Sequence, residues 1–238
     1  MQDIISNLQA LGKTRTCETY RTALNSFMRF RNGSEILVRD LTPELLQAYE
    51  AYLKANSVAM NTISFYMRIL RAAYNRAVER GSVKQNHPFA RVYTGVGQTV
   101  KRSVTFGHLK QIKELDLSDL PGCDYARDMF LFSLYTRGMS FIDMAYLLKT
   151  DLKDGILSYR RRKTGQLLRI RWESCMQEVV DKYPHPDSPY LLPILTSDGQ
   201  RGRMEYKAAI WRVNRHLKKI GEALQLPIPL TMYVARHK

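Results

Sequence analysis

The sequence offers few residues that could hold a metal ion and no hydrophobic run long enough to cross a membrane. Its three cysteines, Cys17, Cys123 and Cys175, lie far apart without a C-x-x-C pair, and its five histidines show no metal-ligand spacing. This pattern favours reduced thiols in a cytosol and argues against a disulfide framework or a zinc site. The N-terminal stretch MQDIISNLQALGK has no long apolar run. We therefore expect a cytoplasmic protein with no signal peptide, no membrane partner and no cofactor or metal.

Acidic residues are scarce relative to basic ones. The 238 residues include 37 Lys and Arg against 22 Asp and Glu, which gives a net charge of +15. The excess is not confined to a tail, because residues 1–100 carry 13 basic against 7 acidic side chains and residues 101–238 carry 24 against 15. A globular protein with such an excess usually faces a polyanion, and nucleic acid is the commonest one. A soluble basic protein without such a partner is the alternative.

A chain of 238 residues with 45% apolar side chains fits two ordinary domains and excludes a disordered protein. Apolar residues at three-to-four spacing predict helices over residues 14–30, from Thr42-Pro43 onward, and over about residues 60–80. The third helix carries four arginines on its other face with only Glu79 nearby, which favours phosphate contact over a merely solvated face. These candidate DNA-binding residues are Arg68, Arg71, Arg76 and Arg80.

Residues 93–104, YTGVGQTVKRSV, contain two glycines and no apolar periodicity, which predicts a linker. An ordinary surface loop is the alternative. We therefore expect an all-α domain over residues 1–92 and an α+β domain with a small antiparallel sheet over residues 105–238. The protein as a whole is predicted to be mainly α.

Within the second domain, the apolar segment around residues 125–135 predicts a central core helix. Ser140 and Asp143 form an S-x-x-D pattern that predicts a capping box at the start of the next helix. The segment ILSYRRRKTGQLLRIRW predicts a β-hairpin that turns at Thr164-Gly165. A long amphipathic helix is expected over residues 205–224.

The tip of the predicted hairpin reads Arg-Arg-Arg-Lys over residues 160–163. Because alternate residues of a strand share a face, Arg161 and Lys163 are expected to point the same way, roughly 7 Å apart. Arg160 and Arg162 then point to the opposite face, where we expect them to contact DNA. Taken alone, such a run is more often a DNA-backbone patch than part of a catalytic site.

Two further places in the second domain are basic. On a helix beginning at Thr231, the side chains of Tyr233, Arg236 and His237 would share one side. Arg137 lies in the turn before the helix that Ser140 opens. A group of Arg, Lys and His without carboxylate pairs or metal ligands suits the stabilisation of a pentacoordinate phosphorus without a metal. Spacing alone does not assemble these residues into one site.

Several motifs together resemble the tyrosine recombinase (phage-integrase-type) family over nearly the whole chain. Gly81, Asn86 and Pro88 match G-x-x-x-x-N-x-P at the end of a helical, SAM-like core-binding domain. Lys163 in KTG matches a lysine at a β-hairpin turn of the catalytic domain. LTMYVARH resembles the box L-T-x-H-x-x-R-H, and RGMSFIDMAYL resembles T-G-x-R-x-x-E-x-x-x-L. The combination is specific, whereas no single motif is.

The chain departs from the family pattern at its first arginine. Alignment on Gly138 and Asp143 puts Ser140 at that position, and Arg137 lies three residues earlier. Three readings remain open: Arg161 beside Lys163 supplies the charge, Arg137 supplies it from a shifted turn, or the function is lost. The strand alternation favours Arg161.

The C-terminal box departs from the pattern as well. Tyr233 stands where the family has a histidine, and a tyrosine hydroxyl donates a hydrogen bond but is no imidazole base near neutral pH. In the family, a third box and the nucleophilic tyrosine lie downstream of this segment. We therefore expect both to lie beyond Lys238, and none of the fourteen tyrosines present matches the nucleophile position.

The resemblance implies site-specific DNA recombination, in which a tyrosine attacks a DNA phosphate, forms a 3′-phosphotyrosyl link and exchanges strands without metal or ATP. Arg236 would then stabilise the charge of the transition state, and Lys163 would protonate the leaving 5′-oxygen. Arg161 or Arg137 would replace the missing arginine, and Tyr233 would be an auxiliary donor. His237, which follows Arg236, completes the candidate catalytic set.

The implied partner is double-stranded DNA, on which the chain could form a homo-oligomer. A DNA-binding module without chemistry is the main alternative, and for this polypeptide it is the favoured behaviour. Binding to RNA is a weaker alternative, because the sequence lacks the usual RNA-binding motifs and exposed aromatic patterns.

Overall fold

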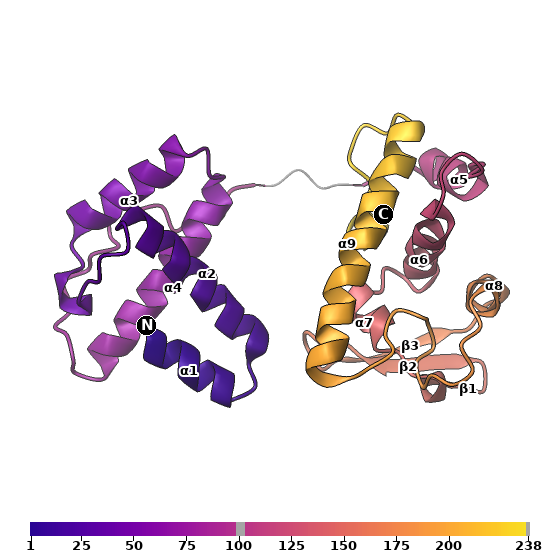
Figure 1. Cartoon of the computed structure of the whole chain (residues 1–238), viewed down its shortest axis with the longest axis horizontal. Helices are drawn as coiled ribbons and strands as arrows, with labels where there is room; N and C mark the ends of the chain where they lie inside the picture. The colour runs from indigo at the N-terminus through magenta and orange to yellow at the C-terminus, as the bar shows by residue number, and fades with distance from the viewer. Residues whose placement is uncertain (99–102, 237–238) are drawn as a thin grey trace. The chain divides into compact units, whose positions relative to one another are not determined.

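The structure, a computed structural model, describes residues 1–98 and 103–236 (Figure 1). The chain divides into two compact units, Met1–Thr99 and Val100–Lys238, and each has its own hydrophobic core. His237 and the part of the predicted linker at residues 99–102 lie outside the described residues.

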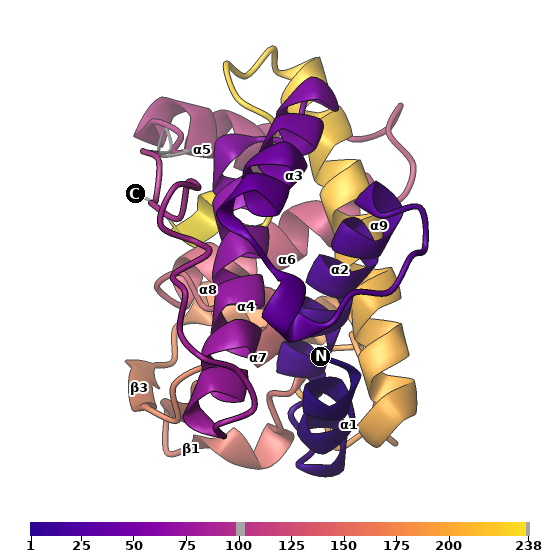
Figure 2. The same ribbon diagram turned by 90° about the vertical axis from the view of Figure 1, so that its left-hand side faces the viewer.

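The first unit is a bundle of α-helices around an aromatic core (Figure 2). Phe27, Tyr49 and Tyr74 are buried in this core. The helix predicted to begin at Thr42-Pro43 does begin there, because the Thr42 hydroxyl accepts a hydrogen bond from the Leu45 N–H and Pro43 occupies the first helical position. The first helix was not predicted from the sequence. The elements are α1 (Gln2–Ala10), α2 (Thr14–Phe30), the 3-10 turn η1 (Val38–Asp40), α3 (Pro43–Ala55) and α4 (Met60–Glu79).

The start of the predicted linker is hydrogen-bonded to α4. The Asn61 side chain accepts from the Gly97 N–H at 2.7 Å and donates to the Gly97 carbonyl at 3.2 Å. The Ser64 hydroxyl donates to the carbonyl of Gly95, and Arg71 donates to the Thr94 hydroxyl. A side chain on Gly97 would press against the Asn61 amide oxygen. Residues 93–97 are therefore part of the first unit and not a free linker.

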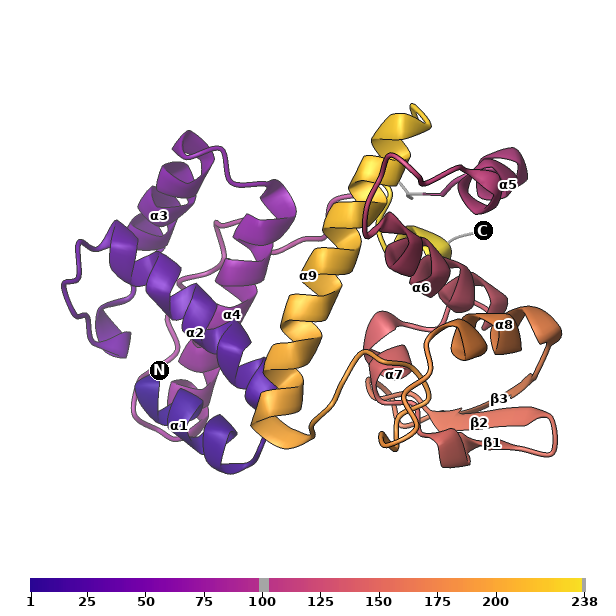
Figure 3. The same cartoon turned by 45° about the vertical axis from the view of Figure 1, so that its right-hand side comes forward.

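The second unit combines helices with a three-stranded antiparallel sheet of order β1-β2-β3 (Figure 3). The mainly α fold class predicted from the sequence is confirmed. The elements are α5 (Phe106–Glu114), α6 (Cys123–Tyr135), α7 (Phe141–Ala145), η2 (Lys149–Asp151), β1 (Leu152–Lys153), β2 (Ile156–Arg160), β3 (Leu167–Arg171), α8 (Ser174–Lys182), α9 (Gly199–Ala223) and η3 (Val234–Arg236).

Helix α6 is the central core helix of this unit, as its apolar sequence predicts. Met129, Phe130 and Phe132 are fully buried, and α9 packs along α6 through Val213 and Leu217. The inner face of the sheet closes the core. In the part of the chain that the structure describes, no helix is both long and apolar enough to span a bilayer.

Candidate functional site

Arg236 lies at the end of the described chain, on a short turn anchored in the core. Val234 and Ala235 are buried, and the Met232 N–H donates to the Asn214 side chain of α9 at 2.9 Å. These anchors leave the Arg236 side chain exposed. The prediction of an α-helix beginning at Thr231 is wrong over the described residues, because they form the 3-10 turn η3, which begins at Val234.

The turn after α6 packs directly on Arg236. Gly138 has a φ of +78°, and a Cβ at this position would come within 3.1 Å of the Arg236 Cα, so only glycine fits here without displacement. The preceding residue, Arg137, has a φ of +58° and an exposed side chain. The structure therefore places Arg137 beside Arg236, although about one hundred residues of sequence separate them.

The hairpin turn that carries Lys163 is longer than predicted. Strand β2 ends at Arg160, the Arg161 N–H donates to the Gln166 carbonyl, and the Gly165 N–H donates to the Arg161 carbonyl at 2.7 Å. Lys163 therefore lies in the turn, with an exposed side chain, and not on a strand. The argument that strand alternation puts Lys163 on the same face as Arg161 is wrong, because alternation stops where the strand stops.

Asp143 holds this turn against α7. Its side chain is buried, with one carboxylate oxygen accepting from the Arg162 N–H at 2.9 Å and the other accepting from the Ser140 hydroxyl at 2.5 Å. Ser140 is the N-cap residue of α7, as predicted, but its hydroxyl makes no capping bond. The predicted capping box is therefore wrong, since Ser140 orients Asp143 instead of closing the helix.

Arg160 and Arg162, which were predicted to contact DNA from the opposite face, have partners within the chain. The Arg162 guanidinium stacks on the Tyr146 ring with 3.7 Å between its central carbon and the ring centroid. One nitrogen of the Arg160 guanidinium donates to the Gly165 carbonyl at 3.1 Å. Both side chains stabilise the turn, although the residues themselves are exposed.

Arg161 and Arg236 act electrostatically on the same group, the hydroxyl of Tyr159 on β2. Burial, and then the Asp143 carboxylate, raise the pKa of Tyr159 to about 12, although the positive charges of Arg161 and Arg236 act in the opposite direction. Both arginines therefore lie within electrostatic range of Tyr159. Arg161 belongs to the turn of Lys163, and Arg236 packs on the turn that carries Arg137. Arg236 and Lys163 are exposed and Arg161 is half-buried, and such a cluster of cations matches the chemistry of a phosphate group.

The four arginines of α4 do not form one patch. Arg71 donates to Thr94 on one flank of the helix, whereas the Arg76 guanidinium lies 5.6 Å from the Tyr20 ring of α2 on the other flank. Five residues of helix separate them by about 140°. Arg68 and Arg80 are exposed.

A basic surface on α9 was missed by the sequence reasoning, which used this helix only for its apolar stripe. Trp211 is 62% exposed, and the Arg215 guanidinium lies 4.9 Å from its ring centroid. The signal was available, because the cations fall between the apolar positions of the stripe. The exposed basic residues of α9 are Arg201, Lys207, Arg212, Arg215, Lys218 and Lys219.

The described residues contain no group of three or more His, Cys, Asp or Glu side chains arranged to hold a metal ion. The three cysteines are free thiols, and Cys17 and Cys123 are buried.

Comparison with known protein families decides the nature of the first unit. Residues 1–92 match the family model described as the phage integrase SAM-like domain. The first unit is therefore similar to this domain over nearly its whole length, and we call it the SAM-like domain for this similarity. No curated protein matches the chain.

Solved structures match the whole chain and not only the SAM-like domain. A λ integrase dimer bound to a COC′ core site matches with a TM-score of 0.71 and 16% identity, over 99% of this chain and 82% of that one. A λ integrase tetramer bound to a Holliday junction matches with a TM-score of 0.71 and 17% identity, over 99% and 66%. The Tn1549 transposon integrase in complex with transposon right end DNA matches with a TM-score of 0.63 and 15% identity, over 91% and 78%.

At these identities the likeness concerns the fold. The SAM-like domain is followed by a second unit with the fold of the corresponding part of these integrases. Together with the family match, this is consistent with a tyrosine recombinase-family chain.

Proposed function

We propose that this chain binds double-stranded DNA through both of its units, as the DNA-gripping part of a tyrosine recombinase of a mobile genetic element. The observation that carries this proposal is the fold shared over nearly the full chain with integrases solved on DNA. A net charge of +15 supports it. We place the protein in the cytoplasm, where free thiols persist, and on DNA we expect more than one copy.

The phosphate to be attacked sits, in this proposal, between Arg236, Arg161 and Lys163. The two guanidinium groups bind the non-bridging oxygens and neutralise the charge that builds up on phosphorus. The attacking tyrosine, which we assign to none of the fourteen in this chain, loses its hydroxyl proton to solvent as its oxygen bonds to phosphorus. The bond from phosphorus to the 5′-oxygen breaks, and Lys163 gives that oxygen a proton. Arg137 borders the site from its own turn, and Tyr233 donates a hydrogen bond.

Tyr159 is not the nucleophile of this reaction. Its side chain is buried, so its hydroxyl cannot reach a phosphate in solution. The second candidate function is a DNA-binding module without chemistry. Such a module needs the same cations to bind a phosphate, but it needs no nucleophile.

Two measurements test the proposal. In fluorescence anisotropy, the wild-type chain should bind duplex DNA more tightly than single-stranded RNA of equal length. The Arg161→Gln/Arg236→Gln variant should bind duplex DNA severalfold more weakly than the wild type does. The control variant Lys110→Gln/Lys113→Gln removes the same charge from exposed positions on α5 and should change binding less. Equal binding of RNA and duplex would contradict the proposal.

A nicked suicide substrate separates binding from chemistry. We expect no SDS-stable adduct, because none of the fourteen tyrosines matches the family's nucleophile position. An adduct would show that one of them attacks DNA, and mapping it would identify which.

A further inference from the structure

The outer face of the three-stranded sheet carries a row of exposed cations. Successive residues of a strand point to opposite faces, so the core takes Leu157, Tyr159 and Ile170. Their neighbours point outward. These outward residues are Lys153 on β1, Ile156, Ser158 and Arg160 on β2, and Leu167, Arg169 and Arg171 on β3.

Each pair of opposite residues on β2 and β3 that points to this face forms one rung of the sheet. The register places one arginine in each of these rungs. Arg171 pairs with Ile156, and Arg169 pairs with Ser158. Arg160 pairs with Leu167 on the third rung, beside the turn of Lys163. Rungs on one face are about 7 Å apart, so the three charges form a regular row and do not converge on one point. A row of this kind suits a polyanion better than a compact anion.

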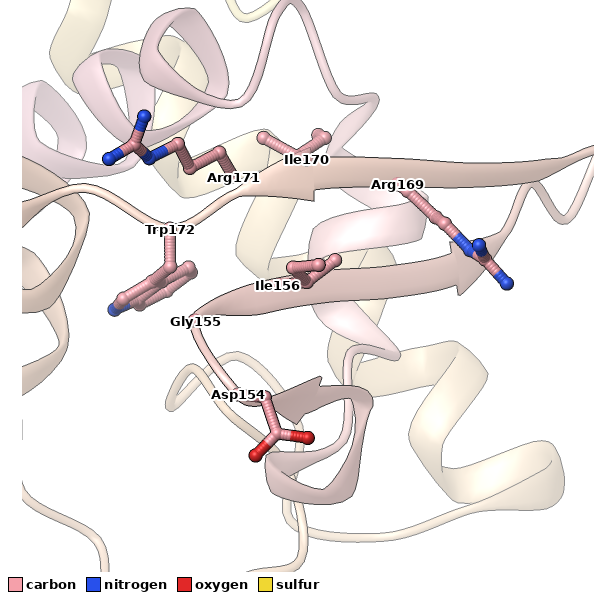
Figure 4. A pocket seen from close by; sticks show the side chains of 7 residues that line it. All are labelled: Asp154, Gly155, Ile156, Arg169, Ile170, Arg171 and Trp172. Atoms are coloured by element: carbon pink, nitrogen blue, oxygen red, sulfur yellow. The ribbon is translucent and has the colours of Figure 1, made fainter.

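The cations of this row form no salt bridge with the residues that the structure describes. Among residues 1–98 and 103–236, no carboxylate oxygen lies within 4.0 Å of the charged nitrogens of Lys153, Arg160, Arg169 or Arg171. A shallow groove of about 580 Å³ lies at one end of the face. Figure 4 shows Arg169 and Arg171 extending from β3 in opposite directions, with Ile156 on the neighbouring strand and Asp154 as the acidic residue of the groove.

The apolar residues of this face do not form a patch that would suit a protein partner. Ile156 and Leu167 are each 44% exposed. They occupy the first and third rungs on different strands, so about 14 Å of strand separates them, and the rung of Ser158 and Arg169 lies between. Isolated exposed apolar side chains of this kind are ordinary on a protein surface.

We propose that Lys153, Arg160, Arg169 and Arg171 on the outer face of the sheet bind the phosphate backbone of duplex DNA, as an extension of the contact made by the Lys163 turn. This inference rests on the proposed DNA-binding function and adds a surface to it. Arg160 gives one donor to Gly165 and keeps the other donors of its guanidinium for a phosphate.

The test is the salt dependence of DNA binding by the intact chain. The variant Arg169→Gln/Arg171→Gln should have a log–log salt slope shallower than that of the wild type by about 1.8, because each lost phosphate contact removes about 0.9. Lys110→Gln/Lys113→Gln on α5 is the control for net charge and should change the slope by less than half as much. Arg169→Lys/Arg171→Lys keeps the charges and should restore the slope.

The outcomes separate this surface from the proposed function. A wild-type slope near zero overturns DNA binding by the chain, and the surface with it. A steep wild-type slope that the Arg169→Gln/Arg171→Gln variant leaves unchanged, or lowers only as much as the control does, overturns the surface alone. Loss of a wild-type dimer in Ile156→Asp/Leu167→Asp, with an unchanged slope, would show instead that a second copy covers this face.

Discussion

Arg137 has a backbone conformation that arginine rarely adopts. A left-handed conformation costs an L-residue about 1–2 kcal/mol, and non-glycine residues held in it are concentrated at functional sites. The exposed side chain of Arg137 is not needed to fill the core. Its distinguishing feature is the contact of the next residue, Gly138, with Arg236. We propose that this contact gives the Arg137 guanidinium a role at the phosphate.

Arg137→Gly should stabilise the protein by about 1 kcal/mol while weakening DNA binding severalfold, because glycine adopts the left-handed region without strain. Gln225→Gly is the matched control, since Gln225 has a φ of +50°, is exposed and follows α9. It should give a similar gain in stability with unchanged DNA affinity. Urea unfolding and anisotropy measure the two quantities. Unchanged affinity in Arg137→Gly would remove Arg137 from the site.

Asp143 is the residue whose loss should do most to disorder the Lys163 turn. Asp143→Ala leaves the N–H of Arg162 and the hydroxyl of Ser140 without their acceptor, which should cost about 1–3 kcal/mol. Asp143→Asn keeps an oxygen for the Arg162 N–H and should cost less. Hydrogen exchange at Arg162 should accelerate more than exchange in β3 in the alanine variant. Equal acceleration throughout the sheet would mean that Asp143 stabilises the unit generally and does not hold the turn.

At the scale of elements, periodic patterns predicted the fold well and the turns poorly. The apolar stripes predicted helices α4 and α9, and Thr42-Pro43 predicted the start of α3. These signals are local in the sequence. The run over residues 160–163 alternates in sequence whether or not it lies on a strand, so it could not show that β2 ends at Arg160. The partner of Asp143 lies nineteen residues away, and no local pattern encodes such a contact.

The entry into α9 depends on one carboxylate. Glu205 accepts hydrogen bonds from the backbone N–H groups and the hydroxyls of Thr196 and Ser197. A Cβ on Gly202 would come within 2.2 Å of the Ser197 carbonyl oxygen, so the loop and the helix are in close contact here. The loop that leads into α9 is thus tied to the first turns of the helix.

These hydrogen bonds predict a pH dependence. The bonds from Thr196, and then those from Ser197, lower the pKa of Glu205 from 4.5 to about 2. A pKa that is lower in the folded state contributes stability that is fully present above 4.5 and is lost as the pH falls towards about 2. Thermal unfolding should therefore show wild type more stable than Glu205→Gln near neutral pH, with the difference shrinking through this window. A constant difference would contradict the assignment.

At the scale of the whole molecule, the positive charge is spread over both units. The SAM-like domain carries exposed Arg68 and Arg80 on α4, and the second unit carries the cluster around Arg236 and the basic surface of α9. A charge distribution of this breadth matches a long polyanion and not a small ligand. The hydrogen bonds of residues 93–97 to α4 mean that the chain leaves the SAM-like domain only after Gly97.

The salt dependence of binding to a generic DNA duplex tests the central claim most directly. Each phosphate neutralised by the protein contributes about −0.9 to the slope of log affinity against log salt concentration. With on the order of six phosphate contacts shared between the two units, we expect a slope of about −5. A slope near zero, or no binding at low salt, would contradict the account.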